Sequence, residues 1–157
     1  DLLKSFGIEA QIKWPNDILV AKKKIAGILI QNKLQKKYIT HSIIGLGFNV
    51  NQLIFKDYPI DATSLRLQLN KEHEVLEIQD QFLFSLSLRL KYLKDGRNQE
   101  NEYLKSLYLK GKPAAFVSNN KQFMGIIKGV SKFGKLIIQL EDDSIIEFEN
   151  QQIKYLF

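Results

Sequence analysis

The stretch Lys13-Trp14-Pro15-Asn16-Asp17 decides how the rest of the sequence is interpreted. A short strand-like run ends at Pro15, because proline has no backbone N–H with which to continue a strand ladder. We therefore expect the next two side chains to project at the edge of a sheet. Asn16 offers amide donors and a carbonyl acceptor, Asp17 offers a carboxylate suited to magnesium, and Lys13 offers a positive charge for phosphate. Taken alone, the pentapeptide fits a plain turn with Trp14 in the core better than it fits a site.

A second informative stretch is Lys24-Ile25-Ala26-Gly27-Ile28-Leu29. Lys24 precedes an almost continuous apolar run, so we expect its ammonium group to be held at the mouth of a buried strand. Gly27, inside that strand, predicts the close approach of a ligand or of another backbone segment. A surface lysine and a packing glycine are the simpler explanation of this stretch when it is considered alone.

The third stretch is Gly45-Leu46-Gly47-Phe48-Asn49-Val50-Asn51. Its two glycines, at the end of a strand-like run, would let the backbone come close to a flat ligand. Asn49 could then pair with the edge of a base. A Gly-x-Gly pattern by itself is weak evidence and usually marks a bulge or a turn.

Composition limits the class of protein. The 157 residues carry a formal net charge of +6 and are 45% hydrophobic, which is enough for a core. Residues 1–50 hold eight lysines against three acidic residues, so the positive excess lies around the three stretches and would favour an anionic ligand. On charge alone, however, a solvated lysine-rich face is the better explanation. There is no cysteine and no long apolar run, which excludes thiol catalysis and predicts a cytoplasmic protein without a membrane span. Met124 is the sole methionine, so we expect a longer parent protein.

Apolar spacing predicts the elements around these stretches. Strands are expected at residues 11–14, 25–30 and 38–46, buried on both faces, with Lys22 to Lys24 forming a hairpin turn. A loop at residues 51–61 and a short helix at 63–69 should follow. Two further helices are expected, at 77–94 and 99–110, because their apolar residues recur every three or four positions.

The pattern of the sequence changes after Gly111, from helical spacing to short strand-like runs. Four or five short strand-like runs follow at a spacing of about ten residues, separated by turn residues such as Asn119-Asn120 and Asp142-Asp143. This spacing predicts a small barrel, in which closure of the sheet removes exposed edges. We therefore place a domain boundary near Gly111, between residues 1–111 and residues 112–157.

Together and in this order, the three stretches resemble the biotin–protein ligases. That family has a Lys-Trp-Pro-Asn-Asp motif, then a Lys-(Leu/Ile)-Ala-Gly-Ile-Leu strand, then a Gly-x-Gly-(Ile/Phe)-Asn strand, and the looser resemblance extends along essentially the whole chain. It implies an α+β fold: a truncated, partial mixed β-sheet with helices, like a class II aminoacyl-tRNA synthetase, followed by a small SH3-like β-barrel. It also implies that ATP and Mg²⁺ activate biotin as biotinyl-5′-adenylate, and that biotin passes to a lysine of a biotin carboxyl carrier domain.

The resemblance also assigns roles to individual residues. Lys24 would be catalytic and would contact both the biotin carboxylate and the phosphoryl group, stabilising charge as the new bond forms. The ATP-binding residues would be Lys13, Asn16, Asp17 and Asn49, with Asp17 contacting Mg²⁺ directly or through water. The biotin site would be lined by Lys24, Gly27, Gly45, Gly47 and Phe48.

One expected feature of the family is missing from residues 1–157. A Gly/Arg-rich loop should precede the three stretches, yet the only arginines are Arg66, Arg89 and Arg97 in the later helical part. We therefore expect an incomplete active site, weak activity of this chain alone, and an exposed sheet edge and apolar surface. A homodimer is left open. The alternative is a non-catalytic small barrel that binds nucleic acid or a protein partner, but the positive excess lies outside the expected barrel.

Overall fold

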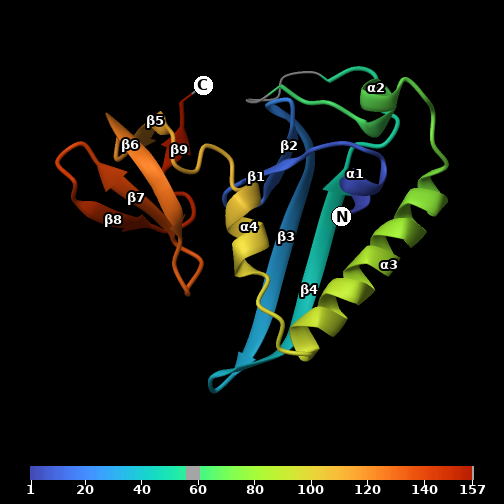
Figure 1. Cartoon of the computed structure of the whole chain (residues 1–157), viewed down its shortest axis with the longest axis horizontal. Helices are drawn as coiled ribbons and strands as arrows, with labels where there is room; N and C mark the ends of the chain where they lie inside the picture. The colour runs from blue at the N-terminus through green and yellow to red at the C-terminus, as the bar shows by residue number, and fades with distance from the viewer. Residues whose placement is uncertain (56–60, 157) are drawn as a thin grey trace. The chain divides into compact units, whose positions relative to one another are not determined.

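The computed structural model describes residues 1–55 and 61–156 and has an α+β fold with two antiparallel sheets (Figure 1). The chain forms two compact units, Asp1–Asn98 and Gln99–Phe157. The predicted α+β class is confirmed. Part of the expected loop at residues 51–61 lies outside the described residues.

The first unit contains a four-stranded sheet in the order β1-β2-β3-β4. Each pair of neighbouring strands is antiparallel. We expected a mixed sheet, but parallel pairing within the described part of this unit is confined to an isolated bridge between Lys24 and Ala62. The strands are β1 (Gln11–Lys13), β2 (Asp17–Val20), β3 (Lys23–Gln35) and β4 (Tyr38–Phe48).

A two-residue turn joins β2 to β3. Val20 pairs with Lys23, and the intervening Ala21 and Lys22 both have positive φ angles, of 47° and 65°. Such turns match the right-handed twist of the flanking strands. The prediction that the turn extends from Lys22 to Lys24 was therefore wrong at its end, because Lys23 and Lys24 already belong to β3.

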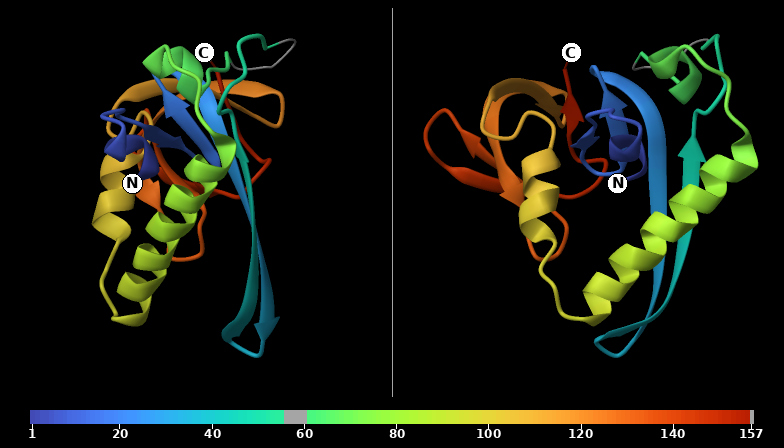
Figure 2. Two further views of the ribbon diagram at one scale, coloured as in Figure 1. Left: turned by 90° about the vertical axis from the view of Figure 1, so that its right-hand side faces the viewer. Right: turned by 45° about the vertical axis from the view of Figure 1, so that its right-hand side comes forward.

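The long β3–β4 hairpin is exposed over most of its length, and its far end extends past β1 and β2 (Figure 2). Beyond Ile28 its apolar side chains remain accessible, including Leu29 at 60% and Ile43 at 71%. The expectation of strands buried on both faces was therefore wrong for this part of the sheet. Continuous apolar sequence shows what a strand is able to bury, not what packs against it in this chain.

The two short helices of the first unit and the first turns of its long helix pack near the other end of the hairpin. Ser64, which is fully buried, caps α2 by accepting a hydrogen bond from the Leu67 backbone N–H at 3.2 Å. A small core gathers Val50, Leu65 and Ile78. Among the described residues, no helix is both long and apolar enough to cross a membrane. The helices are α1 (Leu2–Ser5), α2 (Leu65–Leu69) and α3 (Val75–Lys94).

The second unit is a helical turn followed by a five-stranded antiparallel sheet in the order β8-β7-β6-β5-β9. Its core contains stacked rings, with the Phe123 centroid 5.7 Å from those of both Phe116 and Phe148. The predicted turn at Asn119-Asn120 is confirmed, since both residues have positive φ angles. The elements are α4 (Glu100–Ser106), β5 (Pro113–Ser118), β6 (Lys121–Val130), β7 (Leu136–Leu140), β8 (Ile145–Phe148) and β9 (Lys154–Tyr155).

The two compact units divide the chain before α4, whereas the sequence predicted a domain boundary after it, near Gly111. Within the second unit, the Gly111 backbone N–H donates to the Ile127 carbonyl at 2.9 Å, and Lys110 forms a bridge with Ile127. The segment after α4 is thus tied to β6. The functional assignment of residues 1–111 and 112–157, and the SH3-like barrel, stay predictions.

Close packing of the second unit predicts that Gly125→Ala will destabilise it. A Cβ at Gly125 would lie 2.5 Å from Ile138 Cγ2 and 3.1 Å from the Gln139 carbonyl oxygen, so β6 and β7 would have to separate. We expect a loss of about 1–3 kcal/mol in the free energy of unfolding, measured by urea unfolding with near-ultraviolet circular dichroism. Gly129→Ala is the control, because its Cβ would meet only Leu104 Cδ2, at 3.3 Å, and should cost less. Equal losses in the two variants would contradict the packing of β6 on β7.

Candidate active site

Strand register brings the three sequence motifs together. Asp17 of β2 pairs with Gly27 of β3, and Gly27 pairs with Gly47 of β4. Residues paired directly across neighbouring strands project on the same face of a sheet. One face of the sheet therefore carries the Asp17 carboxylate beside glycines that have no side chain. Gly45 lies two positions before Gly47, so it faces the same side.

The backbone at Gly45 and Gly47 is open on this face. A Cβ at Gly47 would meet just the Gly27 carbonyl oxygen among the described atoms within 4 Å, at 4.0 Å. A Cβ at Gly45 would meet the Leu29 backbone oxygen at 3.8 Å and Leu29 Cβ at 4.0 Å. The two glycines of the third motif thus leave space over β4, as a ligand-binding floor requires.

The opposite face of the sheet forms part of the core. Ile18 pairs with Ala26, which pairs with Phe48. These side chains pack with Val20 and Ile25 in a buried cluster. Phe48 is therefore placed on the core side of β4, away from the glycine face, although the sequence grouped it with the biotin-lining residues.

Lys24 is held through its backbone by a segment far away in the sequence. Its N–H donates to the Asp61 carbonyl at 2.7 Å, and its own carbonyl accepts from the Thr63 N–H at 2.9 Å. The strand register shifts between Ile18 and Leu19, where a bulge separates the Asp17–Gly27 pair from the pair of Leu19 with Lys24. The Lys24 side chain can thus reach back toward Asp17.

Two lysines share the Asp17 carboxylate. Lys24 Nζ lies 2.5 Å from Oδ1, and Lys13 Nζ lies 3.5 Å from Oδ2. The Lys13 and Asp17 side chains are 13% and 14% exposed, and that of Lys24 is 37% exposed. This cluster of Lys13, Asp17 and Lys24, called here the lysine–carboxylate cluster, carries one excess positive charge. Such a charge, partly shielded from solvent, attracts an anion.

The two asparagines connect the motifs through hydrogen bonds. Asn49 Nδ2 donates to the Thr63 carbonyl at 3.1 Å, and the Asn49 backbone N–H donates to Ile25 at 2.9 Å. The backbone carbonyl of Asn16 accepts from the Ile28 backbone N–H at 2.9 Å. Asn49 thus has a structural contact in addition to any role toward a base, and Asn16 fixes the end of the first motif against β3.

Sequence reasoning missed the contribution of Thr63. Its side chain is buried, and its backbone joins Lys24 to Asn49. The short helix that follows was expected to start at this residue, but Ser64 is its N-cap and Thr63 lies outside it. Ser64 was a usable signal for the helix start, because serine is favoured at N-caps, whereas nothing local in the sequence indicates the pairing of Thr63 with Lys24.

The cluster does not fit a resident magnesium site. Both oxygens of Asp17 are paired with ammonium groups, and the two lysines would repel a divalent cation. Among the described residues there is no group of three or more His, Cys, Asp or Glu side chains that could hold a metal ion. A magnesium ion that arrives already bound to the phosphates of a nucleotide remains compatible with this surface, because the phosphates neutralise its charge.

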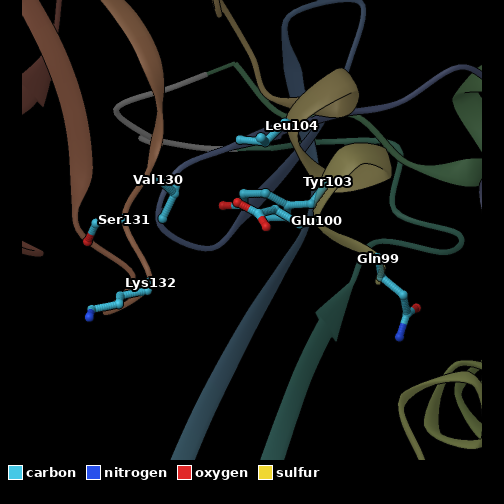
Figure 3. A pocket seen from close by; sticks show the side chains of 7 residues that line it. All are labelled: Gln99, Glu100, Tyr103, Leu104, Val130, Ser131 and Lys132. Carbon is cyan, nitrogen blue, oxygen red and sulfur yellow. The ribbon is translucent and has the colours of Figure 1, made fainter. Parts of the chain in front are cut away.

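The second unit contains a separate cavity of about 370 Å³ (Figure 3). Tyr103 and Leu104 of α4 face Val130, Ser131 and Lys132 at the end of β6 and the turn after it. Burial raises the pKa of the Tyr103 phenol above its ordinary value. The cavity contains none of the residues that the sequence singled out, and its open, mixed lining indicates no particular ligand.

The chain is similar in sequence to known proteins. Residues 3–49 match the Biotin/lipoate A/B protein ligase family, a range that holds all three motifs up to Asn49. The chain is 40% identical over 65 residues to the bifunctional ligase/repressor BirA of Bacillus subtilis (strain 168), covering 41% of this chain and 20% of that protein. It is 25% identical over 158 residues to BirA of Escherichia coli (strain K12), covering 94% of this chain and 46% of that protein.

A solved structure extends the likeness to the whole fold. The chain superposes on biotin protein ligase from Aquifex aeolicus in complex with biotin and ATP with a TM-score of 0.76 and 25% identity, covering 99% of this chain and 65% of that chain. The fold is therefore that of the biotin protein ligases, and the motif-bearing part of the chain resembles the Biotin/lipoate A/B protein ligase family. The chain spans less than half the length of the curated relatives compared above.

The contact between Asn49 and Thr63 predicts a stability effect. Asn49→Ala removes the side-chain donor to the Thr63 carbonyl, and Thr63 is a buried residue. We therefore expect a loss of about 1–3 kcal/mol in the free energy of unfolding. Urea unfolding followed by the fluorescence of Trp14, the single tryptophan, measures it. The control is Asn32→Ala, whose exposed partner is Ser42, with an expected change within about 0.5 kcal/mol. A loss at Asn49 no larger than that at Asn32 would contradict the contact.

Proposed function

We propose that this chain contributes Lys13 and Lys24, the positively charged groups of an active site that activates biotin with ATP. In the first step, an oxygen of the biotin carboxylate attacks the α-phosphorus of ATP, the bond to pyrophosphate breaks, and biotinyl-5′-adenylate forms. In the second step, a lysine amine of a biotin carboxyl carrier domain attacks the acyl carbon, AMP leaves, and the amine loses a proton. Magnesium enters as the MgATP substrate and neutralises phosphate charge.

The observation that carries this proposal is the position of the lysine–carboxylate cluster beside the open glycine face. Two anions meet in the first step, the carboxylate of biotin and the α-phosphate of ATP, so their mutual repulsion must be reduced. Lys24 is a preorganised positive charge at the edge of the open surface formed by Gly45 and Gly47, and it stabilises the negative charge that gathers as the bond forms. Lys13 adds a second positive charge for the phosphates.

The remaining site residues have supporting roles in this proposal. Gly45 and Gly47 leave room for the fused rings of biotin over β4. Asn16 and Asn49 would face the nucleotide, and Asn49 keeps its amide tied to Thr63 while its carbonyl oxygen faces the adenine. Phe48 supports the floor from its core side.

The test is biotin-dependent release of pyrophosphate from MgATP by the chain. Because residues 1–157 contain no Gly/Arg-rich stretch, we expect slow turnover. Removing the positive charge in Lys24→Ala should lower the rate by about 10²–10³-fold, the size typical of losing one preorganised charge-stabilising group. Lys23→Ala is the matched control, because Lys23 is a half-exposed neighbour that pairs with Asp61, and we expect its rate to stay within about twofold.

A binding measurement accompanies the rate. A non-hydrolysable analogue of biotinyl-adenylate should change the fluorescence of Trp14, which adjoins Lys13, and Lys24→Ala should weaken that binding. Analogue binding without turnover would still support the proposed site. If the chain neither releases pyrophosphate in response to biotin nor binds the analogue, or if Lys23→Ala and Lys24→Ala behave alike, the proposal fails.

A further inference from the structure

Asp17 sits at the centre of the site, yet its surroundings differ from those of a metal ligand. Its two oxygens are occupied by different cations, Lys24 on one side and Lys13 on the other. It is also mostly shielded from solvent, with a side chain 14% exposed. A carboxylate used in this way orients ammonium groups, because it restricts where each one can lie.

The backbone of Lys24 is fixed independently of its side chain. Hydrogen bonds to Asp61 and Thr63 hold the peptide groups on both sides of its Cα. The four-carbon side chain would still have many rotamers available from that fixed point, since lysine loses much conformational entropy when it is ordered. The contact with Asp17 selects the rotamers that bring Nζ back over β3.

Gly27 provides the space that this path needs. A Cβ built at Gly27 would lie 3.4 Å from both Cε and Nζ of Lys24, and 3.7 Å from Oδ1 of Asp17. The position where other residues carry a side chain is therefore filled by the end of the Lys24 side chain. An alanine at position 27 would just touch the lysine. The two methyl groups of a valine would occupy the volume in which the end of the Lys24 side chain lies.

We propose that Asp17 and Gly27 are positioning residues that together seat the Lys24 ammonium group, and that Asp17 does not bind magnesium. Asp17 sets the direction of the ammonium group, and Gly27 supplies the space in which it lies. The charge arithmetic is consistent with this role. Two lysines and one aspartate leave a single positive charge for the anionic substrate, and that charge disfavours a divalent cation at the same carboxylate. The catalytic consequence rests on the proposed function, whereas the seating of Lys24 does not.

The seating is tested directly by nuclear magnetic resonance relaxation of the lysine side chains in the full chain. In the wild type, the Cε and Nζ of Lys24 should have higher order parameters than those of exposed lysines. Asp17→Asn should lower them to the range of exposed lysines. Asp61→Asn is the matched control, because it removes the neighbouring partner of Lys23 and should leave the Lys24 signal unchanged. Equal mobility of Lys24 in the wild type and in Asp17→Asn would overturn the inference.

The role of Gly27 is tested with the same signal. Gly27→Val should displace the ammonium group and raise its mobility, while Gly27→Ala should have a smaller effect. Gly45→Val is the control for adding the same side chain to the same face of the sheet, since a Cβ there meets no lysine. If Gly27→Val leaves Lys24 ordered, the space at Gly27 has no positioning role.

Kinetics separates the positioning role from a metal-binding role. For biotin-dependent pyrophosphate release, Asp17→Asn should lower kcat by about 100-fold, the order expected for a misplaced catalytic group, with the KM for MgATP within about threefold. The Mg²⁺ concentration for half-maximal rate should not change. A rise of tenfold or more in that concentration, with Lys24 still ordered, would show that Asp17 binds magnesium and would overturn the inference. Should the wild type neither release pyrophosphate nor bind the adenylate analogue, the proposed function fails, and the relaxation measurements still decide whether Asp17 and Gly27 position Lys24.

Discussion

The site depends on one geometric constraint, the register that places Asp17, Gly27 and Gly47 side by side on three strands. A slip of one residue in any of these pairings would turn the corresponding side chain to the core face, because successive residues of a strand point to opposite faces. The buried contacts of Ile18 and Ala26 on the other face oppose such a slip. The core of the first unit therefore keeps the polar residues in place without touching the ligand side of the sheet.

Within that register, the ion pairs contribute position more than stability. A partly exposed pair such as Lys24 with Asp17 is worth only about 0–1 kcal/mol of folding free energy. Its value lies in holding a mobile ammonium group at a fixed point before a substrate arrives. Catalysis by electrostatic stabilisation requires this, since a charge that must first be ordered stabilises the transition state less.

The sequence predicted those parts of the structure that local patterns determine. The apolar spacing located the long helix α3 to within two residues, and Asn119-Asn120 located a turn. The three motifs identified Lys24 and Asp17 as site residues, but no local pattern indicates that they pair with each other. Their contact depends on a cross-strand register and a bulge, which arise from packing of the whole sheet. The exposure of β3 and β4 and the core position of Phe48 were missed for the same reason, because a strand sequence does not specify its neighbours.

The distribution of burial explains why the site occupies one end of the hairpin. Near Ile25 and Ala26, β3 has β2 on one side, β4 on the other and a core beneath, so backbone and side chains are constrained. Farther along, apolar side chains such as Leu34 and Ile39 are more than half exposed among the described residues, and local opening there costs little. A preorganised charge requires the constrained environment near Ile25 and Ala26. Lys24 lies one residue before the fully buried Ile25, at the point where β3 enters the core, and this makes an ordered ammonium group possible on an otherwise accessible strand.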